Sequence, residues 1–295
     1  MINSNDFNPN INHHIKAFRN RKLGRTESFD LVMYKYIRLE YVLDMLDTHV
    51  LRFNNINKWD DVYENFVDKE DLNLLNSKHE DMSARVVFGQ SWTTCEESDA
   101  MWRIYSKDDK SAVRVMTVYP LFVQTLLEWN EKHKDNILFE TTDYVSYADE
   151  KEINEWILSN TPMNFWAFNE LRHECLFIKR LEFDHEKEVR VIFTKTNSNN
   201  EEYIGIDFDP HHFFREIVID PRVNDNEYIQ RRASLIEHGF DGNKIRKSTL
   251  YDFKKVKIDI DMTEPCDFQI TSYSQKDGKP VQETVFMKGP ETPEK

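Results

Sequence analysis

Strand-like and helix-like stretches follow one another irregularly along this chain, and that irregularity limits the folds open to it. Residues 188–194 (E-V-R-V-I-F-T) and 203–208 (Y-I-G-I-D-F) alternate with the period of two that is typical of strands. The polar residues 195–202 between them predict a hairpin loop. Residues 226–238 have the pattern of an amphipathic helix, with Gly239 as its expected C-terminal cap. Because no regular βαβ rhythm is present, we predict an α+β fold with mixed, mainly antiparallel sheets and peripheral helices.

The two ends of the chain differ in composition from its middle. Residues 1–28 are polar and rich in Asn, which predicts a flexible N-terminal segment. Residues 29–260 contain the strand and helix patterns, and we expect them to form a single α+β domain. From residue 261 the composition shifts toward Thr, Glu, Pro, Lys and Gly, so 261–295 should be a flexible tail or a peripheral hairpin that turns at Asp277-Gly278.

Charge and composition argue against several classes of protein. The net charge of −14 repels phosphates at long range and disfavours general nucleic-acid binding. Glycine occurs only 7 times, and no glycine-rich phosphate loop is present. The three cysteines, Cys95, Cys175 and Cys266, form neither a C-x-x-C pair nor a metal-ligand spacing. No apolar run approaches the roughly 20 residues of a membrane span. We therefore expect a reduced, cytoplasmic protein without a membrane segment or a metal site.

Four short motifs carry most of the chain's functional signal. They are Y-K-Y at 34–36, W-D-D-V-Y-E at 59–64, M-W-R-I-Y at 101–105 and E-K-E-V-R at 186–190. In their order and spacing they resemble a bacterial domain-of-unknown-function family whose members read approximately Y-K-Y, F-N-D-P-F-E, M-W-x-x-Y and E-K-E-W-R. The resemblance extends over about residues 31–250.

The layout of these motifs is similar to the plan of ADP-ribosyltransferase-like proteins. In that plan a first strand carries a polar residue that holds NAD, a second carries Ser or Thr, and a later strand carries a catalytic Glu. The resemblance implies that NAD is consumed as a substrate and that the chain is a toxin or a phage-defence effector. A neutralising protein is then an expected partner. The acceptor is unknown, and the acidic net charge favours a protein over nucleic acid.

Cleavage of the bond between nicotinamide and ribose builds positive charge on the ribose. A fixed carboxylate in a water-poor site stabilises that charge, as in glycoside cleavage. On this hypothesis Glu188 is the catalytic carboxylate, and Glu186 lies on the same strand face and orients the acceptor. Lys35 would supply the charge that His or Arg provides on the first strand of known transferases. The side chains expected to hold the cofactor are Tyr34, Lys35, Tyr36, Ser91, Trp102 and Tyr105.

Two other functions are open at this point. A non-catalytic module of the same fold could sense a nucleotide or a partner, and the missing His or Arg on the first strand favours that alternative. A magnesium-dependent nuclease would require Asp60, Asp61, Glu64 and Glu188 to converge in space. Each motif also has a purely structural interpretation, in which the two glutamates face water and the aromatic residues belong to the core.

Overall fold

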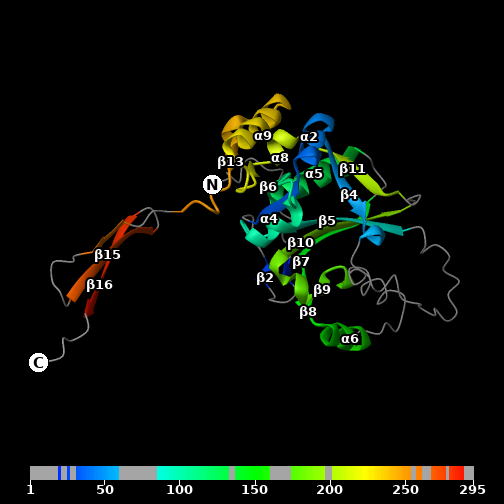
Figure 1. The fold of residues 1–295 in the computed structure, drawn as a ribbon. Helices are drawn as coiled ribbons and strands as arrows, with labels where there is room; N and C mark the ends of the chain where they lie inside the picture. Colours follow the sequence, from blue (N-terminus) through cyan, green and yellow to red (C-terminus); the bar gives the residue numbers. More distant parts are fainter. Residues whose placement is uncertain are drawn as a thin grey trace, which may run out of the picture. The chain divides into compact units, whose positions relative to one another are not determined.

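The computed structural model describes residues 19–20, 25–26, 31–59, 85–132, 137–159, 174–196, 201–253, 257–260, 267–276 and 279–288. The chain divides into two units, residues 1–250 and 251–295 (Figure 1). No helix in these described ranges is long and apolar enough to cross a membrane. Cys95 and Cys175 are present as thiols and not as a disulfide.

A nine-stranded sheet forms the centre of the first unit. Its pairings are antiparallel except for the parallel pair β12–β13. The α+β fold class predicted from the sequence is confirmed. The strands are β3 (Val32–Arg38), β4 (Val50–Asn55), β5 (Arg85–Thr93), β6 (Ala112–Val118), β7 (Ile137–Tyr144), β10 (Glu188–Thr196), β11 (Tyr203–Asp207), β12 (Glu216–Ile219) and β13 (Ile245–Lys247).

Helices and short strands surround this sheet. The helices are α2 (Leu39–Thr48), α4 (Asp99–Ser106), α5 (Tyr119–Lys132), α6 (Glu150–Ser159), α8 (Pro210–Phe213) and α9 (Asp225–Glu237). The 3-10 helices are η2 (Ile56–Lys58), η4 (Leu181–Glu186) and η5 (Gly242–Lys244). Two small two-stranded sheets pair β1 (Arg19–Asn20) with β2 (Arg25–Thr26), and β8 (Ser146–Ala148) with β9 (Ile178–Arg180).

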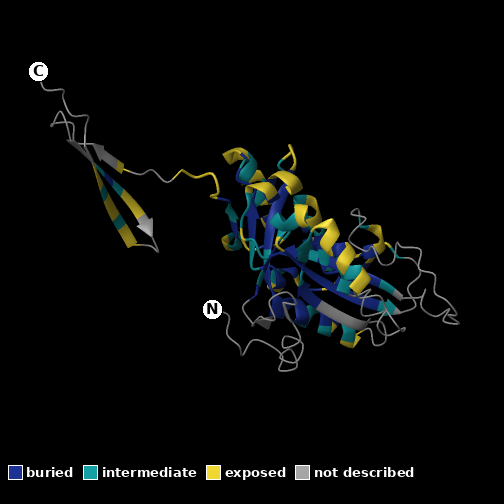
Figure 2. Cartoon of the chain, turned by 90° about the horizontal axis from the view of Figure 1, so that it is seen from below, coloured by how far each residue is buried: buried dark blue, intermediate teal, exposed yellow. Residues whose placement is uncertain are grey.

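The alternation of side chains along β3 explains why helices cover both of its faces. Met33 belongs to the main core, to which α2 and α5 also contribute. Tyr36 points to the opposite face and packs against Met101 and Trp102 of α4. Figure 2 shows the consequence, with buried strands at the centre and exposed residues on the outer sides of the helices. Each large apolar side chain buried in this way stabilises the fold by about 1.5–3 kcal/mol.

The main sheet divides at β5, and this division positions the site described below. β3 pairs with β5 only at Tyr34 and Thr93. Further along the same edge β5 pairs with β4, through Gly89 and Phe88. The other edge of β5 pairs with β10 along the full length of both strands. Beyond Tyr34, therefore, β3 and β5 separate, and the side chains at this point are not covered by a neighbouring strand.

Two local predictions for the first unit were wrong. β10 and β11 do not form a hairpin, because β10 is paired on both edges, with β5 and β7, and β11 pairs with β4 instead. The sequence also predicts a helix over about residues 164–180, but residues 178–180 form strand β9. By contrast, helix α9 and its cap are confirmed: Asn224 and Glu227 form a capping box, and Gly239 has a φ of 87°.

The second unit is a three-stranded antiparallel sheet. Its strands are β14 (Lys257–Ile260), β15 (Asp267–Lys276) and β16 (Lys279–Lys288). Because β14 pairs with β15, the boundary expected after residue 260 cuts through this sheet, and the chain divides after Leu250 instead. The expected turn at Asp277-Gly278 lies between β15 and β16, but those two residues are outside the described ranges.

Candidate functional site

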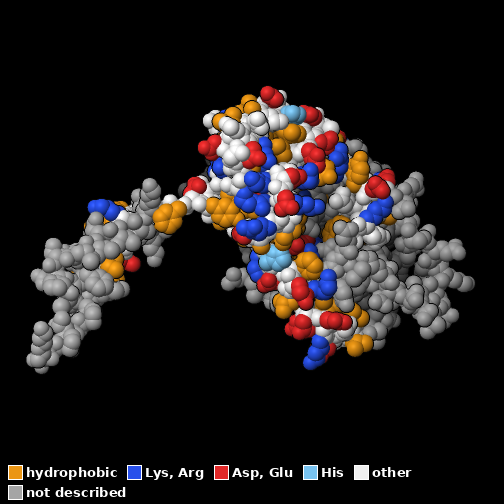
Figure 3. All heavy atoms as spheres, in the orientation of Figure 1, with side chains coloured by type: hydrophobic (Ala, Val, Ile, Leu, Met, Phe, Trp, Pro, Cys, Tyr) orange, Lys and Arg blue, Asp and Glu red, His pale blue; other side chains and the backbone are white. Residues whose placement is uncertain are grey.

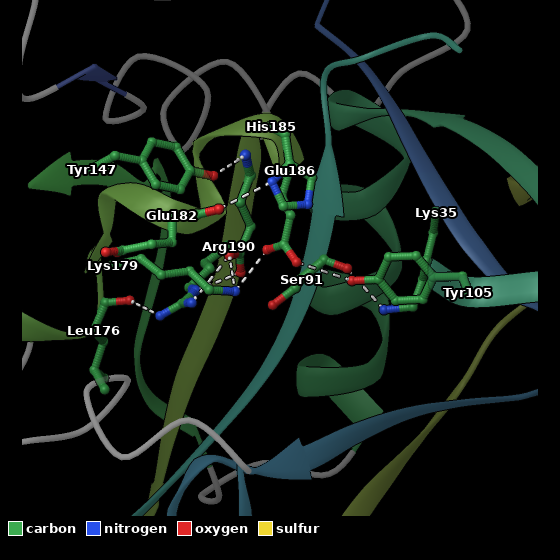
Figure 4. A network of polar contacts seen from close by, with 11 residues as sticks. Lys35, Ser91, Tyr105, Tyr147, Leu176, Lys179, Glu182, His185, Glu186 and Arg190 are labelled. Carbon is green, nitrogen blue, oxygen red and sulfur yellow. Dashed lines mark hydrogen bonds and ion pairs between the residues drawn. The ribbon is translucent and has the colours of Figure 1, made fainter. Parts of the chain in front are cut away.

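The candidate site lies where the C-terminal end of β5 meets the first residues of β10. Glu188 is opposite Thr93, and Arg190 is opposite Ser91. Residues that face each other across two strands share a side of the sheet, so all four side chains point the same way. Figure 4 shows the polar network that includes Ser91 and Arg190 together with residues of β9 and η4.

Glu188 is the buried centre of this network, with 3% of its surface exposed. Its carboxylate accepts hydrogen bonds from Arg190, at 2.5 Å from Nε and 3.1 Å from Nη2, and from Lys179 Nζ at 3.3 Å. Burial by itself raises the pKa of Glu188, but Arg190, Lys179 and a hydrogen bond from the Ser91 side chain outweigh it and bring the pKa to about 2. Glu188 is therefore ionised at neutral pH although it is buried.

Arg190 and Tyr147 fix the position of Glu188. The Arg190 side chain is fully buried, donates from Nη1 to the Leu176 carbonyl oxygen at 2.6 Å and lies 4.8 Å from the ring centroid of Trp59. The backbone N–H of Glu188 donates to the Tyr147 hydroxyl oxygen at 2.8 Å. Burial raises the pKa of Tyr147, so this phenol stays protonated. A buried acid with such a complete set of partners has little freedom to move.

Glu186 joins the network from a different element of secondary structure than the one predicted. We expected Glu186 on the same strand face as Glu188, which is wrong, because Glu186 is the last residue of the 3-10 helix η4. Lys187 then takes a left-handed conformation (φ 42°, ψ 53°) and turns the chain before β10 begins. The two acids nevertheless lie close together, since Lys179 Nζ is 2.7 Å from Glu186 Oε2 and 3.3 Å from Glu188 Oε2.

Lys35 bridges the division between β3 and β5. Its Nζ donates to the Ser91 carbonyl oxygen at 2.8 Å and lies 5.6 Å from the ring centroid of Trp92. Burial lowers the pKa of Lys35 to about 8, and the negative charge of Glu188 opposes that effect. Within the described ranges the Ser91 carbonyl oxygen is the one hydrogen-bond acceptor of the Lys35 ammonium, so further N–H donors of this ammonium are available to a ligand.

The predicted aromatic residues take different places. Tyr34 lies over buried Arg114, with the guanidinium 4.6 Å from the ring centroid. Tyr36 is nearly parallel to Tyr105, at 26° and 6.3 Å between centroids. Tyr105 is 38% exposed, and its hydroxyl makes a long contact of 3.5 Å to Glu186 Oε1.

Trp102 departs from the role expected of it. Its side chain is fully buried, packs edge-on against Tyr36 at 4.8 Å and donates from Nε1 to Glu97 Oε1. Trp102 packs with Tyr36 and Val218 and does not line the first of the cavities at this point, which Met101 and Tyr105 of the same helix do line. Trp102 therefore supports Tyr36 from behind, and Met101 and Tyr105 are the residues of this helix that are placed to contact a ligand.

Two adjoining cavities open at this point, with volumes of about 470 Å³ and about 440 Å³. Both are within the range typical of small-molecule sites. The first is lined by residues that include Tyr34, Lys35, Tyr36, Ser91, Tyr105, Lys179, Glu186 and Glu188. The second is lined by residues that include Ile37, Tyr41, Met45, Leu51, Arg52 and Gln90. Lys35, Asn54, Trp59, Ser91 and Trp92 line both, so the two cavities adjoin at the division of the sheet, and together they are called the cleft.

The lining of this cleft is more basic than the chain as a whole. Its cations are Lys35, Arg52, Lys58 and Lys179, and its anions are Glu186 and Glu188. The chain carries a net charge of −14. Arg52 pairs with Asp44, Lys58 pairs with Glu202, and Lys179 lies between Glu186 and Glu188, so Lys35 is the cation of this lining that is best placed to attract an anionic ligand.

The acids required by a magnesium-dependent nuclease lie mostly outside the described ranges. Asp60, Asp61 and Glu64 are among the residues that the structure does not describe, and only Glu188 of the four is placed. Among the described residues, no group of three or more His, Cys, Asp or Glu side chains could hold a metal ion. Convergence of these four acids stays a prediction.

No protein-family model matches the chain, and no curated protein sequence matches it. Two solved structures are similar: Thermus sp. 2.9 DarT in complex with NAD+, with 11% sequence identity and a TM-score of 0.32, and the same protein in complex with ADP-ribosylated ssDNA, with 11% identity and a TM-score of 0.30. These comparisons cover 75% of this chain and 96% and 99% of the other chains. With identities and TM-scores this low we base no conclusion on the likeness, and the family resemblance of the four motifs stays a prediction.

Proposed function

We propose that this chain is an ADP-ribosyltransferase-like enzyme that consumes NAD. One observation carries the proposal: Lys35, Ser91 and Glu188, from three different strands, line one cleft at the division of the sheet. The carboxylate is ionised, nearly buried and held by several partners. These properties are required of a group that stabilises positive charge in a transition state.

The proposed reaction begins with loss of nicotinamide from the ribose. As the carbon–nitrogen bond breaks, its electron pair leaves with the ring nitrogen and the ribose becomes cationic. Glu188 stabilises that charge from a fixed position, while the Ser91 hydroxyl holds the carboxylate in place. Tyr105 and Tyr36 provide aromatic surface beside the reacting end of the dinucleotide.

Charge complementarity supports a dinucleotide ligand. Around the reacting centre, Lys35, Lys179 and Arg190 oppose Glu186 and Glu188, which gives a net charge of +1. The diphosphate of NAD outweighs the positive charge of its nicotinamide ring, so the ligand is a net anion. We assign the diphosphate to Lys35, where the two cavities join, and the adenosine end to the second cavity.

The test follows nicotinamide release from NAD labelled in the nicotinamide ring. We expect release by the wild type and none by Glu188→Gln. Glu182→Gln is the matched control, because Glu182 is an exposed acid of the neighbouring helix η4, and we expect it to behave like the wild type. Equal release by all three proteins, or no release by any of them, would contradict the proposal.

A second candidate function is a non-catalytic NAD-sensing module. The saturation of Glu188 by Arg190 and Lys179 favours it, because a carboxylate neutralised by two cations stabilises a ribose cation less. Calorimetry of NAD binding at equilibrium separates the two candidates. Binding without nicotinamide release would indicate the sensor, and binding with release would indicate the enzyme.

The acceptor and the biological setting are separate questions. The preference for a protein acceptor rested on the net charge of the whole chain, but the cleft itself is locally basic, so net charge does not decide it. On the face shown in Figure 3, basic side chains lie among acidic ones. A role as a toxin or phage-defence effector belongs to this proposal and is implied by the resemblance of the motifs alone.

A further inference from the structure

Lys179 occupies the space between the two acids of the site. Its side chain is 8% exposed, and its Nζ is 2.7 Å from Glu186 Oε2 and 3.3 Å from Glu188 Oε2. The ammonium also lies 4.7 Å from the ring centroid of Phe183. Strand β9, which carries Lys179, is held in parallel pairing with β8. The cation is therefore a fixed part of the cleft wall.

The other oxygen of Glu186 faces the open side of the cleft. Glu186 Oε1 is 3.5 Å from the hydroxyl of Tyr105, a side chain that is 38% exposed. This phenol is a neutral O–H donor, and its contact with the acid is long. A ligand group of the same kind could take its place and make a shorter hydrogen bond to Glu186.

A cationic group would meet a different environment at the same position. It would approach an acid that already has the Lys179 ammonium 2.7 Å from one of its oxygens. Like charges placed side by side in a partly desolvated site repel strongly. Glu186 is therefore suited to a neutral partner and poorly suited to a guanidinium or an ammonium.

We infer that the acceptor is a neutral nucleophile, an O–H or N–H group that includes water, and that Lys179 excludes cationic acceptors. This inference rests on the proposed function. In the step, a lone pair of the acceptor forms the bond to the ribose carbon as the bond to nicotinamide breaks, and nicotinamide leaves as a neutral molecule. Glu186 takes the proton from the acceptor and afterwards releases it to water.

The test uses agmatine as a guanidinium probe and water as the neutral acceptor. Four full-length proteins are incubated, with and without agmatine, with NAD that carries its label in the ADP-ribose part. They are the wild type, Lys179→Met, Lys179→Arg and Lys187→Met. Free ADP-ribose and ADP-ribosyl-agmatine are then separated and counted. Lys187 is the matched control, since its side chain is 54% exposed and is paired with Asp184. Equilibrium dialysis of labelled agmatine measures binding of the probe without any need for turnover.

We expect the wild type and Lys187→Met to form ADP-ribose and to leave agmatine unmodified and unbound, and Lys179→Arg to leave agmatine unbound as well. Lys179→Met should bind agmatine and increase its modification by at least about tenfold. Modification or binding of agmatine by the wild type would overturn the inference, and so would a folded Lys179→Met that gains neither. If Lys179→Met does not fold, the wild type and Lys179→Arg still decide the question. Absence of nicotinamide release from every protein would contradict the proposed function instead, and the dialysis would still test the exclusion of cations.

Discussion

Acid should lower the free energy of unfolding because Glu188 becomes protonated, and Glu188→Gln should remove this part of the pH dependence. The pKa of Glu188 is about 2 in the folded protein and 4.5 for an ordinary glutamate. Because the folded-state pKa is the lower one, the unfolded chain binds a proton first as the pH falls. The stabilisation is therefore fully present above about pH 4.5 and is lost progressively as the pH falls toward 2.

The magnitude follows from the same two values. A difference of one pH unit in pKa corresponds to about 1.4 kcal/mol, so the ionised carboxylate contributes about 3 kcal/mol at neutral pH. Glu188 is 3% exposed, and solvent screening reduces this contribution little. Between pH 4 and pH 2.5 the free energy of unfolding should fall more steeply for the wild type than for Glu188→Gln, by about 1.4 kcal/mol per pH unit.

Urea unfolding followed by tryptophan fluorescence measures this difference. All six tryptophans lie before residue 251, so the signal reports on the first unit. Glu182→Gln is again the control, and a plot of its free energy of unfolding against pH should run parallel to that of the wild type. If the curve of Glu188→Gln runs parallel as well, Glu188 is not held ionised by Arg190 and Lys179, and the reasoning about the site is refuted.

Two further predictions concern the ligand contacts. Lys35 loses its charge as the pH rises through about 8, so kcat/KM for NAD should fall above that pH. Lys35→Arg should keep a flat pH profile of kcat/KM there, because arginine stays protonated. The same alkaline fall in both proteins would exclude Lys35 as its source. Trp102→Ala should lower the free energy of unfolding by about 3–5 kcal/mol because the ring is fully buried. Tyr105→Ala should change the free energy of unfolding by less than about 1 kcal/mol but should raise KM for NAD. Urea unfolding and steady-state kinetics of both variants would show the reversed pattern if Trp102 were the ligand contact.

The strand pattern was a reliable guide to the part of the site that lies on strands. The alternation of E-V-R-V-I-F-T placed Glu188 and Arg190 on one face, and the structure pairs that face with Ser91. A glutamate and an arginine two residues apart, in a strand that continues with V-I-F, also gave a signal for a buried ion pair. No role was assigned to Arg190 from the sequence.

The contribution of Lys179 could not be predicted from the sequence. Its segment was expected to be helical, and a three-residue strand such as β9 is too short to show a period. Lys179 meets both Glu186 and Glu188 because Lys187, between the two acids, takes a left-handed conformation, which is rare for residues other than glycine. The pairing of β11 with β4 could not be predicted from the sequence for a related reason. A polar loop between two alternating segments predicts a hairpin equally well whether or not the first strand has a free edge.

The central claim is that Glu188 acts on the reacting bond of NAD and not merely on the fold. Single-turnover release of labelled nicotinamide, measured together with the equilibrium Kd for NAD, tests it most directly. We predict that Glu188→Gln slows release by at least about a hundredfold, as loss of a transition-state contact does, while the Kd changes by less than about threefold. Release that slows only in proportion to weaker binding would contradict the account, because Glu188 would then contribute to the ground state alone.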